Sequence, residues 1–344
     1  QENAVDSQVG ETVTTARISG GTQQMSGVFV QDLVKPVDRL TLTFSARVDH
    51  WRNYDAHNLE TSVATGLPTA NNDPSLPDRS DTVVSPHAGA LYRLTDRVSI
   101  WGGVNQGFRA PTLNELYRQF RVGQVLTLAN NQLGPERLLG GEGGVEVSVT
   151  PRATWRATWF DNRIKDAVSN VTLSTTPSTV TQQRQNLART RIRGIQTDLE
   201  YRFGPSWQFS GSYLYEHARV AAVDDPAQLD IVGNYLPQVP NQRATLQMTY
   251  TNPRYVTLSV DLEAVGRQFD DDENLRTVPG ESSPGLPGYA VVDLSVSRTI
   301  GHNLDAFLSV ENLFDQDIIV GTLPTTIGAP RFVSGGIRVR WAGR

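Results

Sequence analysis

The sequence contains no cysteine, no long apolar run and no excess of positive charge. Without cysteine there is no disulfide framework, no Cys-ligated zinc and no thiol catalysis. The formal net charge of −5 argues against a general nucleic-acid binder, which is usually basic. No segment approaches the roughly 20 apolar residues of a transmembrane helix, which excludes helical membrane insertion. A membrane β-barrel is not excluded, because its strands alternate apolar and polar residues and therefore contain no long apolar run.

The sequence is instead rich in strand-like alternation of apolar and polar residues. Between positions 40 and 49 the even-numbered residues are Leu, Leu, Phe, Ala and Val, whereas the odd-numbered ones are Thr, Thr, Ser, Arg and Asp. The same rule recurs over residues 195–203, 242–250, 255–266 and 304–311. Such alternation is typical of strands with one apolar and one polar face.

The connections between these strands alternate between short and long. Turn-forming residues predict tight turns at 37–38, 95–96, 151–152, 204–205, 252–253 and 301–302. Long polar segments lie between them, at about 52–81, 108–137, 171–188, 221–239, 268–287 and 314–330. This series predicts an all-β, antiparallel transmembrane β-barrel region of about 13 strands, with short periplasmic turns and long extracellular loops.

A soluble all-β protein is the alternative architecture. Its strands would be shorter, about five or six residues, and its connections would not segregate so strictly. Charged residues on the polar faces suit a water-filled lumen. Aromatic residues near strand ends suit two interfacial girdles; they are Trp51, Trp155, Trp159, Tyr201, Phe203, Trp207, Tyr213, Tyr215, Tyr250, Tyr289 and Trp341.

One undecapeptide and several further segments carry a family resemblance. Residues 107–117 read Gly-Phe-Arg-Ala-Pro-Thr-Leu-Asn-Glu-Leu-Tyr, directly after a strand-like run. Ser-Pro-His-Ala-Gly-Ala-Leu-Tyr precedes it from position 85, and Val-Glu-Asn-Leu-Phe-Asp follows from position 310. The final strand, 331–341, is similar to the terminal strand that barrel-assembly machinery reads, although three residues follow its last aromatic one. In this order the segments resemble the C-terminal barrel portion of TonB-dependent outer-membrane receptors, over residues 27–341.

The resemblance implies a barrel of 22 strands, of which this chain would supply the last thirteen or so. Nothing in the chain resembles the family's N-terminal plug domain or its TonB-binding box. An open sheet would leave unpaired backbone groups in lipid, at several kcal/mol each. We therefore expect a fragment of a longer receptor: 1–26 as a loop or fragment start, 27–341 as C-terminal barrel, 342–344 as a tail.

The family further implies a function and a location. We expect a multi-pass barrel of the Gram-negative outer membrane, in contact with outer-membrane lipid, that takes up a scarce ligand. A ferric siderophore is the favoured cargo, with TonB and the plug domain of the full-length protein as partners. No catalysis, cofactor or nucleic acid is expected. A passive porin or channel and a soluble all-β binding module are the alternatives.

Five residues are candidates for ligand binding: Arg109, Tyr117, Arg118, Phe120 and Arg121. Their cations and aromatic rings would suit the anionic, planar groups of a siderophore. For Arg109 a structural role is favoured, because Ala110 and Pro111 indicate a shaped strand exit. Residues 111–117 are expected to form a short helical turn. A solvated loop is the favoured interpretation for the other basic and aromatic positions.

No metal or catalytic pattern is expected elsewhere. Asp270, Asp271, Asp272 and Glu273 are dense in oxygen ligands, but their spacing matches no EF-hand, so a solvated acidic loop is predicted. The five histidines are scattered, and no pair has metal-ligand spacing. The glycine-rich stretch 140–144 predicts close strand packing or a kink.

Overall fold

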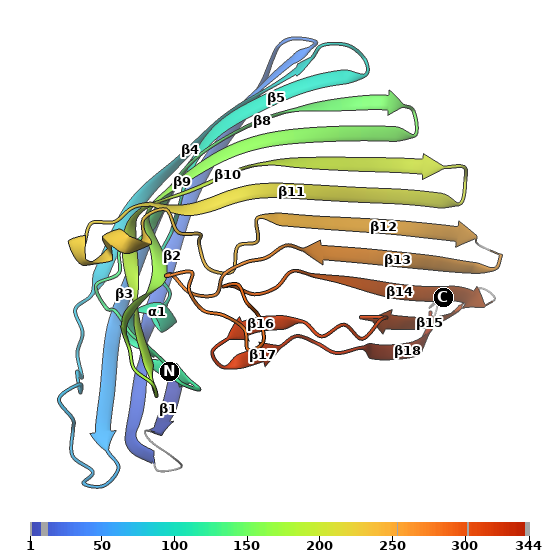
Figure 1. The fold of residues 1–344 in the computed structure, drawn as a ribbon. Coiled ribbons are helices and arrows are strands. Elements are labelled where there is room, and N and C mark those ends of the chain that lie inside the picture. Colours follow the sequence, from blue (N-terminus) through green and yellow to red (C-terminus); the bar gives the residue numbers. More distant parts are fainter. Residues whose placement is uncertain (1, 8–12, 253, 301–302, 341–344) are drawn as a thin grey trace.

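The computed structural model describes residues 2–7, 13–252, 254–300 and 303–340, and Figure 1 shows them as one strongly curved sheet. The sheet has 16 strands, of which β6 (Phe120–Val122) and β7 (Val125–Leu128) lie off the main path. Along that path the strands pair antiparallel in chain order, from β1 (Glu2–Ser7) to β18 (Phe332–Val339). The all-β antiparallel prediction is confirmed, and the strands expected from sequence correspond to the path from β2 onward.

The strands between these ends are long, and few other elements interrupt them. In the first half they are β2 (Val13–Val37), β3 (Leu40–Ser62), β4 (Arg79–Arg93), β5 (Val98–Arg109) and β8 (Glu136–Thr150). In the second half they are β9 (Ala153–Thr175), β10 (Val180–Phe203), β11 (Trp207–Ala222), β12 (Gln242–Asn252), β13 (Val256–Val265), β14 (Tyr289–Ile300) and β15 (Leu304–Glu311). The remaining elements are α1 (Leu113–Tyr117), a 3-10 helix η1 (Pro226–Ile231) and a separate hairpin, β16 (Ile319–Thr322) with β17 (Thr325–Ile327). None of the described residues belongs to a helix long and apolar enough to cross a membrane.

The short and long connections alternate as predicted except between β9 and β10, which only residues 176–179 separate (Figure 1). Tight turns join β2 to β3, β4 to β5, β8 to β9 and β10 to β11. The turns expected at 252–253 and 301–302 include residues outside the described part of the chain, as does the expected tail 342–344. On the other side, the long segment between β5 and β8 carries α1, β6 and β7.

Three segments expected as loops contain long stretches of strand. β3 continues to Ser62 and β4 begins at Arg79, so the loop predicted over 52–81 is much shorter. The segment 171–188, predicted as a loop, is mostly the paired tips of β9 and β10. Residues 1–26, expected as a loop or fragment start, contain β1 and the first half of β2. In these places polar residues occupy both strand faces, so the alternation that marks a membrane strand is missing.

The sheet has two faces of different chemistry. We call the face that carries Asp49, Asp198 and Asp261 the inner face; α1 packs against it on β2 and β3. By cross-strand register, Phe44, Trp159 and Leu246 lie on the opposite, outer face, where they are exposed.

Aromatic side chains gather at two levels of the outer face. Trp207 and Tyr250 pack in a tilted arrangement at the short-turn end, with ring centroids 4.8 Å apart, whereas Trp159 and Tyr215 lie further along the strands. From Trp207 to Tyr215 the chain counts about nine residues, the length with which a tilted strand crosses the hydrocarbon layer. Trp51 does not belong to a girdle: it is 2 % exposed on the inner face, between Asp49 and Asn53.

Candidate functional site: a cavity at the long-loop end

Arg109, the last residue of β5, fixes the exit of that strand. It faces Glu136 of β8 in the register, and Arg109 Nε and Nη2 donate to the two Glu136 carboxylate oxygens at 2.8 and 3.0 Å. Its Nη1 donates to both oxygens of Glu115, at 3.1 and 2.9 Å. Glu136 also accepts a hydrogen bond from the Val168 N–H at 2.6 Å. Each of the three guanidinium nitrogens therefore donates to a carboxylate at the strand exit, which fits a structural role, and a role for Arg109 in ligand binding stays a prediction.

The expected helical turn is present as α1. Thr112 is its N-cap: the Thr112 hydroxyl accepts from the Glu115 N–H at 3.2 Å, and the Glu115 carboxylate accepts from the Thr112 N–H at 2.8 Å. This reciprocal capping box satisfies donors that a helix N-terminus otherwise leaves unpaired. Burial raises the pKa of Glu115, but hydrogen bonds from Arg109 and Thr112 outweigh it and leave that pKa below its ordinary value.

Tyr117 is turned away from the open space of the site. It is 3 % exposed, in a buried cluster with Ala56, Leu76, Leu116 and Leu133. The pKa of its phenol is raised, chiefly because burial disfavours the phenolate. Tyr117 therefore anchors α1 to β3.

Side chains distant in sequence hold α1 and the residues on both sides of it against the wall. Gln23 Nε2 donates to the Pro111 carbonyl at 3.0 Å, and Arg79 Nη1 donates to the Leu133 carbonyl at 2.6 Å. Arg184 of β10 donates to the Asn114 carbonyl at 2.8 Å. The long β5–β8 connection is thus held in place against the inner face.

A cavity of about 640 Å³ opens between this segment, the wall and the later loops. Its volume falls within the usual range of small-molecule sites. Phe120, Arg184 and Arg276 are the aromatic and cationic groups of its lining. The lining also includes Glu115, Val122, Val125, Thr127, Glu136, Ile164, Gln182, Leu187, Thr190, Leu236, Gln238, Asp270, Asp271, Asp272, Val320 and Leu323.

Of the five residues predicted from sequence, Phe120 lines this cavity. The Arg184 guanidinium carbon lies 5.1 Å from the Phe120 ring centroid, and that of Arg118 lies 5.9 Å away. Arg121 follows Phe120 in β6, where it pairs with Leu126 and is half-buried. Arg118 and Arg121 are therefore near the cavity but not part of its lining, and their roles in ligand binding stay predictions.

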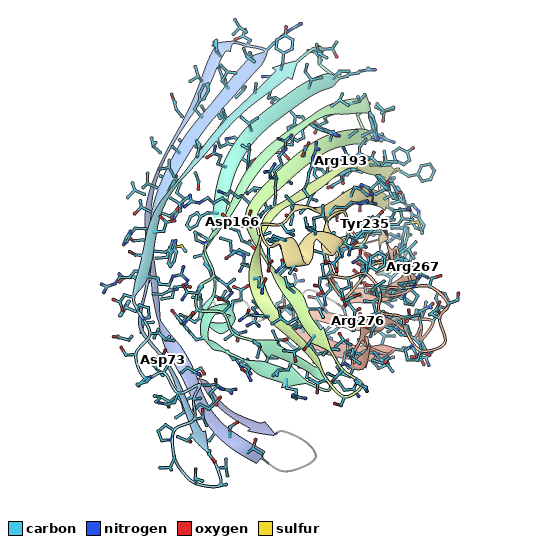
Figure 2. All side chains as sticks on the ribbon, turned by 60° about the vertical axis from the view of Figure 1, so that its left-hand side comes forward. Asp73, Asp166, Arg193, Tyr235, Arg267 and Arg276 are labelled. Carbon is cyan, nitrogen blue, oxygen red and sulfur yellow. The ribbon has the colours of Figure 1, made fainter. Side chains whose placement is uncertain are left out.

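Arg184 and Arg276 are cavity residues that sequence reasoning missed. Arg184 is buried inside a long polar strand, where nothing local distinguishes it. Arg276 lies in the β13–β14 connection and is labelled in Figure 2. Its Nη2 is buried and has no hydrogen-bond partner within the described residues.

The acidic stretch 270–272 connects neighbouring loops through hydrogen bonds. The prediction that it is a solvated loop is wrong. The Asp272 carboxylate accepts from the N–H and hydroxyl of Thr172 at 2.9 and 2.7 Å, and Asp270 accepts likewise from Thr322. Asp271 is 3 % exposed and accepts from the Leu275 N–H at 3.0 Å; burial raises its pKa. Across the described part of the chain, no group of three or more His, Asp or Glu side chains is arranged to hold a metal ion.

Comparison with protein families decides what kind of barrel this is. The model described as "TonB dependent receptor-like, beta-barrel" matches residues 2–313. The chain belongs to the TonB-dependent receptor family. The match begins earlier than the resemblance at residue 27, consistent with strand structure in that region. Members of this family are outer-membrane receptors and transporters, so the chain is located in the outer membrane, and the soluble alternative is set aside.

Individual relatives support the same assignment. The chain is 23 % identical over 326 residues to an iron-regulated outer membrane virulence protein of Vibrio cholerae, covering 90 % of this chain and 44 % of that protein. It is 24 % identical over 260 residues to the catecholate siderophore receptor Fiu of Escherichia coli K12, covering 75 % of this chain and 32 % of the relative. The chain thus spans less than half the length of these relatives.

Solved structures share the fold at low identity. The receptor FyuA of Yersinia pestis superposes with a TM-score of 0.71 at 17 % identity, over 95 % of this chain and 47 % of the receptor. The copper transporter OprC gives a TM-score of 0.70 at 18 % identity, over 95 % of this chain and 48 % of the transporter. Receptors for different cargoes therefore share this barrel, and its shape alone does not indicate the ligand.

Proposed function

We propose that this TonB-dependent receptor takes up a ferric siderophore, and that the loop-end cavity is where the barrel meets it. The observation that carries the proposal is the grouping of Phe120, Arg184 and Arg276 around one cavity on the inner face. TonB and a plug domain are the partners that active transport would require in the full-length protein.

The chemistry of the cavity suits an anionic chelate with planar rings. Guanidinium groups bind anionic oxygens through strong, directed hydrogen bonds, and Arg276 Nη2 has an unused donor there. An aromatic ring beside a cation also offers a face on which a planar ligand group can stack. All five carboxylates of the lining already accept hydrogen bonds, which limits their repulsion of an anion: Glu115 and Glu136 from Arg109, and the acidic stretch 270–272 from Thr322, Leu275 and Thr172.

The relatives point the same way. One is named as a catecholate siderophore receptor and another as an iron-regulated outer membrane protein. At 23–24 % identity these names support the choice of ligand class, not of one compound.

Uptake of radioactive iron tests the proposal. The full-length gene is expressed in a Gram-negative strain that lacks its own catecholate receptors, and uptake of a ferric catecholate is measured with and without TonB. We expect TonB-dependent uptake, reduced about tenfold or more by Arg276→Gln, because one charged hydrogen bond contributes about 1.5–3 kcal/mol. Arg52→Gln is the matched control: it removes an exposed arginine ion-paired with Asp78, and uptake should be unchanged.

Two other results would reject the proposal. Solute entry that is independent of TonB and of the proton gradient would identify a passive channel. TonB-dependent uptake of copper or another cargo, with no iron chelate transported, would keep the family mechanism but refute the siderophore.

A further inference from the structure

After η1 the β11–β12 connection returns along the tip of β11. The Leu236 N–H donates to the Ala218 carbonyl at 3.0 Å, and Tyr235 pairs with Arg219 in an antiparallel bridge. Side chains alternate along such a segment, so Tyr235 shares the face of Arg219, whereas Leu236 is on the opposite face and lines the cavity. What holds Tyr235 in place therefore also holds a part of the cavity wall.

The Tyr235 side chain connects the tip of β11 to a second loop, and it is labelled in Figure 2. Its hydroxyl oxygen accepts from Arg219 Nη2 at 2.8 Å and lies 3.1 Å from His217 Nε2. The Arg219 guanidinium carbon lies 4.3 Å from the Tyr235 ring centroid. On the other side, the ring stacks on Phe269 of the β13–β14 connection, with centroids 5.7 Å apart and planes 17° from parallel.

The backbone beside Tyr235 is joined to the same second loop. The Tyr235 N–H donates to Asn274 Oδ1 at 2.7 Å, and Asn274 Nδ2 donates to the Tyr235 carbonyl at 3.0 Å. The Gln238 N–H donates to the Phe269 carbonyl at 2.6 Å. Gln238 lines the cavity, as does Arg276 of the β13–β14 connection. The two connections are thus adjoining parts of the cavity wall, joined around Tyr235.

The Tyr235 hydroxyl can donate its proton to His217 only while that histidine is neutral. A phenol has one O–H donor, and its oxygen is here the acceptor for Arg219. A neutral imidazole can offer an unprotonated Nε2 as the acceptor, whereas a protonated one has two N–H donors and no acceptor. Protonation of His217 therefore removes this acceptor and leaves the tyrosine oxygen between two cationic donors.

The charges around His217 are mostly positive. Arg219 lies two residues further along the same strand, and Arg193 lies directly opposite on β10. The carboxylate of this row, Asp161 on β9, is ion-paired with Arg191. Like charges directly opposite on adjacent strands are destabilising. A proton on His217 would thus add a third positive charge beside two arginines.

His217 lies two residues beyond Tyr215, on the loop side of the outer aromatic residues. Burial lowers the pKa of His217, and the charges of Arg219 and Arg193 lower it further. Arg267, at the start of the β13–β14 connection, brings no counter-charge and donates to the carbonyls at 283 and 284. A folded-state pKa below the ordinary value of about 6.5 means that the contribution of neutral His217 is fully present above pH ~6.5 and is lost as the pH falls below it.

We propose that His217 and Tyr235 form a pH-sensitive latch, which joins the β11–β12 and β13–β14 connections at neutral pH and releases them when His217 takes up a proton. Release would loosen the cavity wall at Leu236 and Gln238. Mild acid would therefore speed the exchange of small solutes between the cavity and the medium at the loop end. The role of the latch in uptake rests on the proposed function, whereas the latch itself does not depend on the cargo.

Hydrogen exchange in the purified full-length receptor, without cargo, tests the latch. The amides of Tyr235, Leu236 and Gln238 are followed at about pH 7.5 and about pH 5.5, on either side of the ordinary histidine pKa, with correction for intrinsic rates. We expect their protection in wild type to fall roughly 2- to 12-fold at the lower pH, the range that loss of one hydrogen bond gives. In His217→Gln the side-chain amide oxygen can still accept from Tyr235 but cannot be protonated in this range, so protection should be equal at both pH values.

Two further variants separate the latch from general effects of acid. His50→Gln removes an exposed histidine that is hydrogen-bonded to Thr82 on β3, and it should keep the full acid response. Tyr235→Phe keeps the ring that stacks on Phe269 but lacks the hydroxyl. Its protection should therefore be low at both pH values.

Three results would each overturn the proposal. An acid response of equal size in His217→Gln would assign the sensor to another group, such as Asp271. No acid response in wild type would show that the latch does not open. Equal acceleration in the membrane strands would indicate general unfolding. Each of these results is independent of iron uptake, so failure of the latch can be distinguished from failure of the proposed function.

Discussion

The carboxylate of Asp272 accepts two hydrogen bonds from Thr172, a residue 100 positions earlier, at 2.9 Å from its N–H and 2.7 Å from its hydroxyl. The β13–β14 connection is thereby fastened to the tip of β9. The neighbouring Asp270 fastens the same connection to Thr322 of β16. One acidic stretch thus holds together the elements that enclose the cavity.

Removing the hydrogen bonds between Asp272 and Thr172 should increase local opening of the loops. Asp272→Ala leaves the Thr172 N–H without its acceptor, which costs about 1–3 kcal/mol for a buried group. We expect amide hydrogen exchange at residues 171–175 to accelerate by about 5- to 150-fold while the membrane strands stay protected. Asp96→Ala, in a tight turn at the opposite side of the sheet, is the control. Unchanged exchange in Asp272→Ala would show that the two hydrogen bonds between Asp272 and Thr172 contribute nothing to loop order.

Arg109 should behave as a structural residue. Arg109→Ala leaves the half-buried Glu115 and Glu136 carboxylates without their shared partner, and because Arg109 is itself 42 % exposed the loss should be only about 1–2 kcal/mol. In Arg109→Ala, protease cleavage within residues 110–135 should be faster than in wild type, and any loss of transport should accompany this local loosening. A ligand-binding Arg109 would behave differently: Arg109→Lys would then lower the apparent affinity for cargo without any change in protease sensitivity.

The sequence was sufficient to predict most of the sheet, because strand alternation and turn residues are local signals. The run 40–49 becomes part of β3 as its period of two indicates. The sequence predicts a loop at the tips of β9 and β10, because polar residues there lie on both faces and each tip is a strand only through its pairing with the other.

The cavity depends on contacts that no local pattern encodes. Arg184 reaches the Asn114 carbonyl across 70 positions, and Asp272 and Asp270 accept hydrogen bonds from Thr172 and Thr322, which are also distant in sequence. Phe120 is predicted from sequence because an aromatic residue between arginines is a local pattern, and the structure places it in the cavity lining, although its role in ligand binding stays a prediction. Arg184, which lies beside it, has no such local pattern.

The order of the α1 segment should depend on acid pH. The folded-state pKa of Glu115 lies below its ordinary value of about 4.3, so Glu115 stabilises the segment above that value. This stabilisation is lost as the pH falls through the folded-state pKa. Hydrogen exchange of the Leu116 amide, corrected for intrinsic rates, should therefore rise as the pH is lowered below about 4.3 in wild type. In Glu115→Gln the protection should be lower at pH 7 and nearly independent of pH; an equal acid response in both proteins would contradict this role.

Gly144 of β8 should be intolerant of any side chain. A Cβ built there would lie 2.5 Å from the Ala157 carbonyl oxygen and 2.9 Å from the Trp101 indole, because the Trp101 ring covers this glycine on the inner face. The backbone oxygen cannot move away without breaking strand pairing, so Gly144→Ala should destabilise the barrel by about 1–3 kcal/mol. Gly141 in the same strand is the matched control, since its Cβ would meet nothing closer than 3.9 Å. The midpoint of thermal unfolding of the full-length protein in detergent should fall for Gly144→Ala and stay unchanged for Gly141→Ala; equal midpoints would show that Trp101 can move aside.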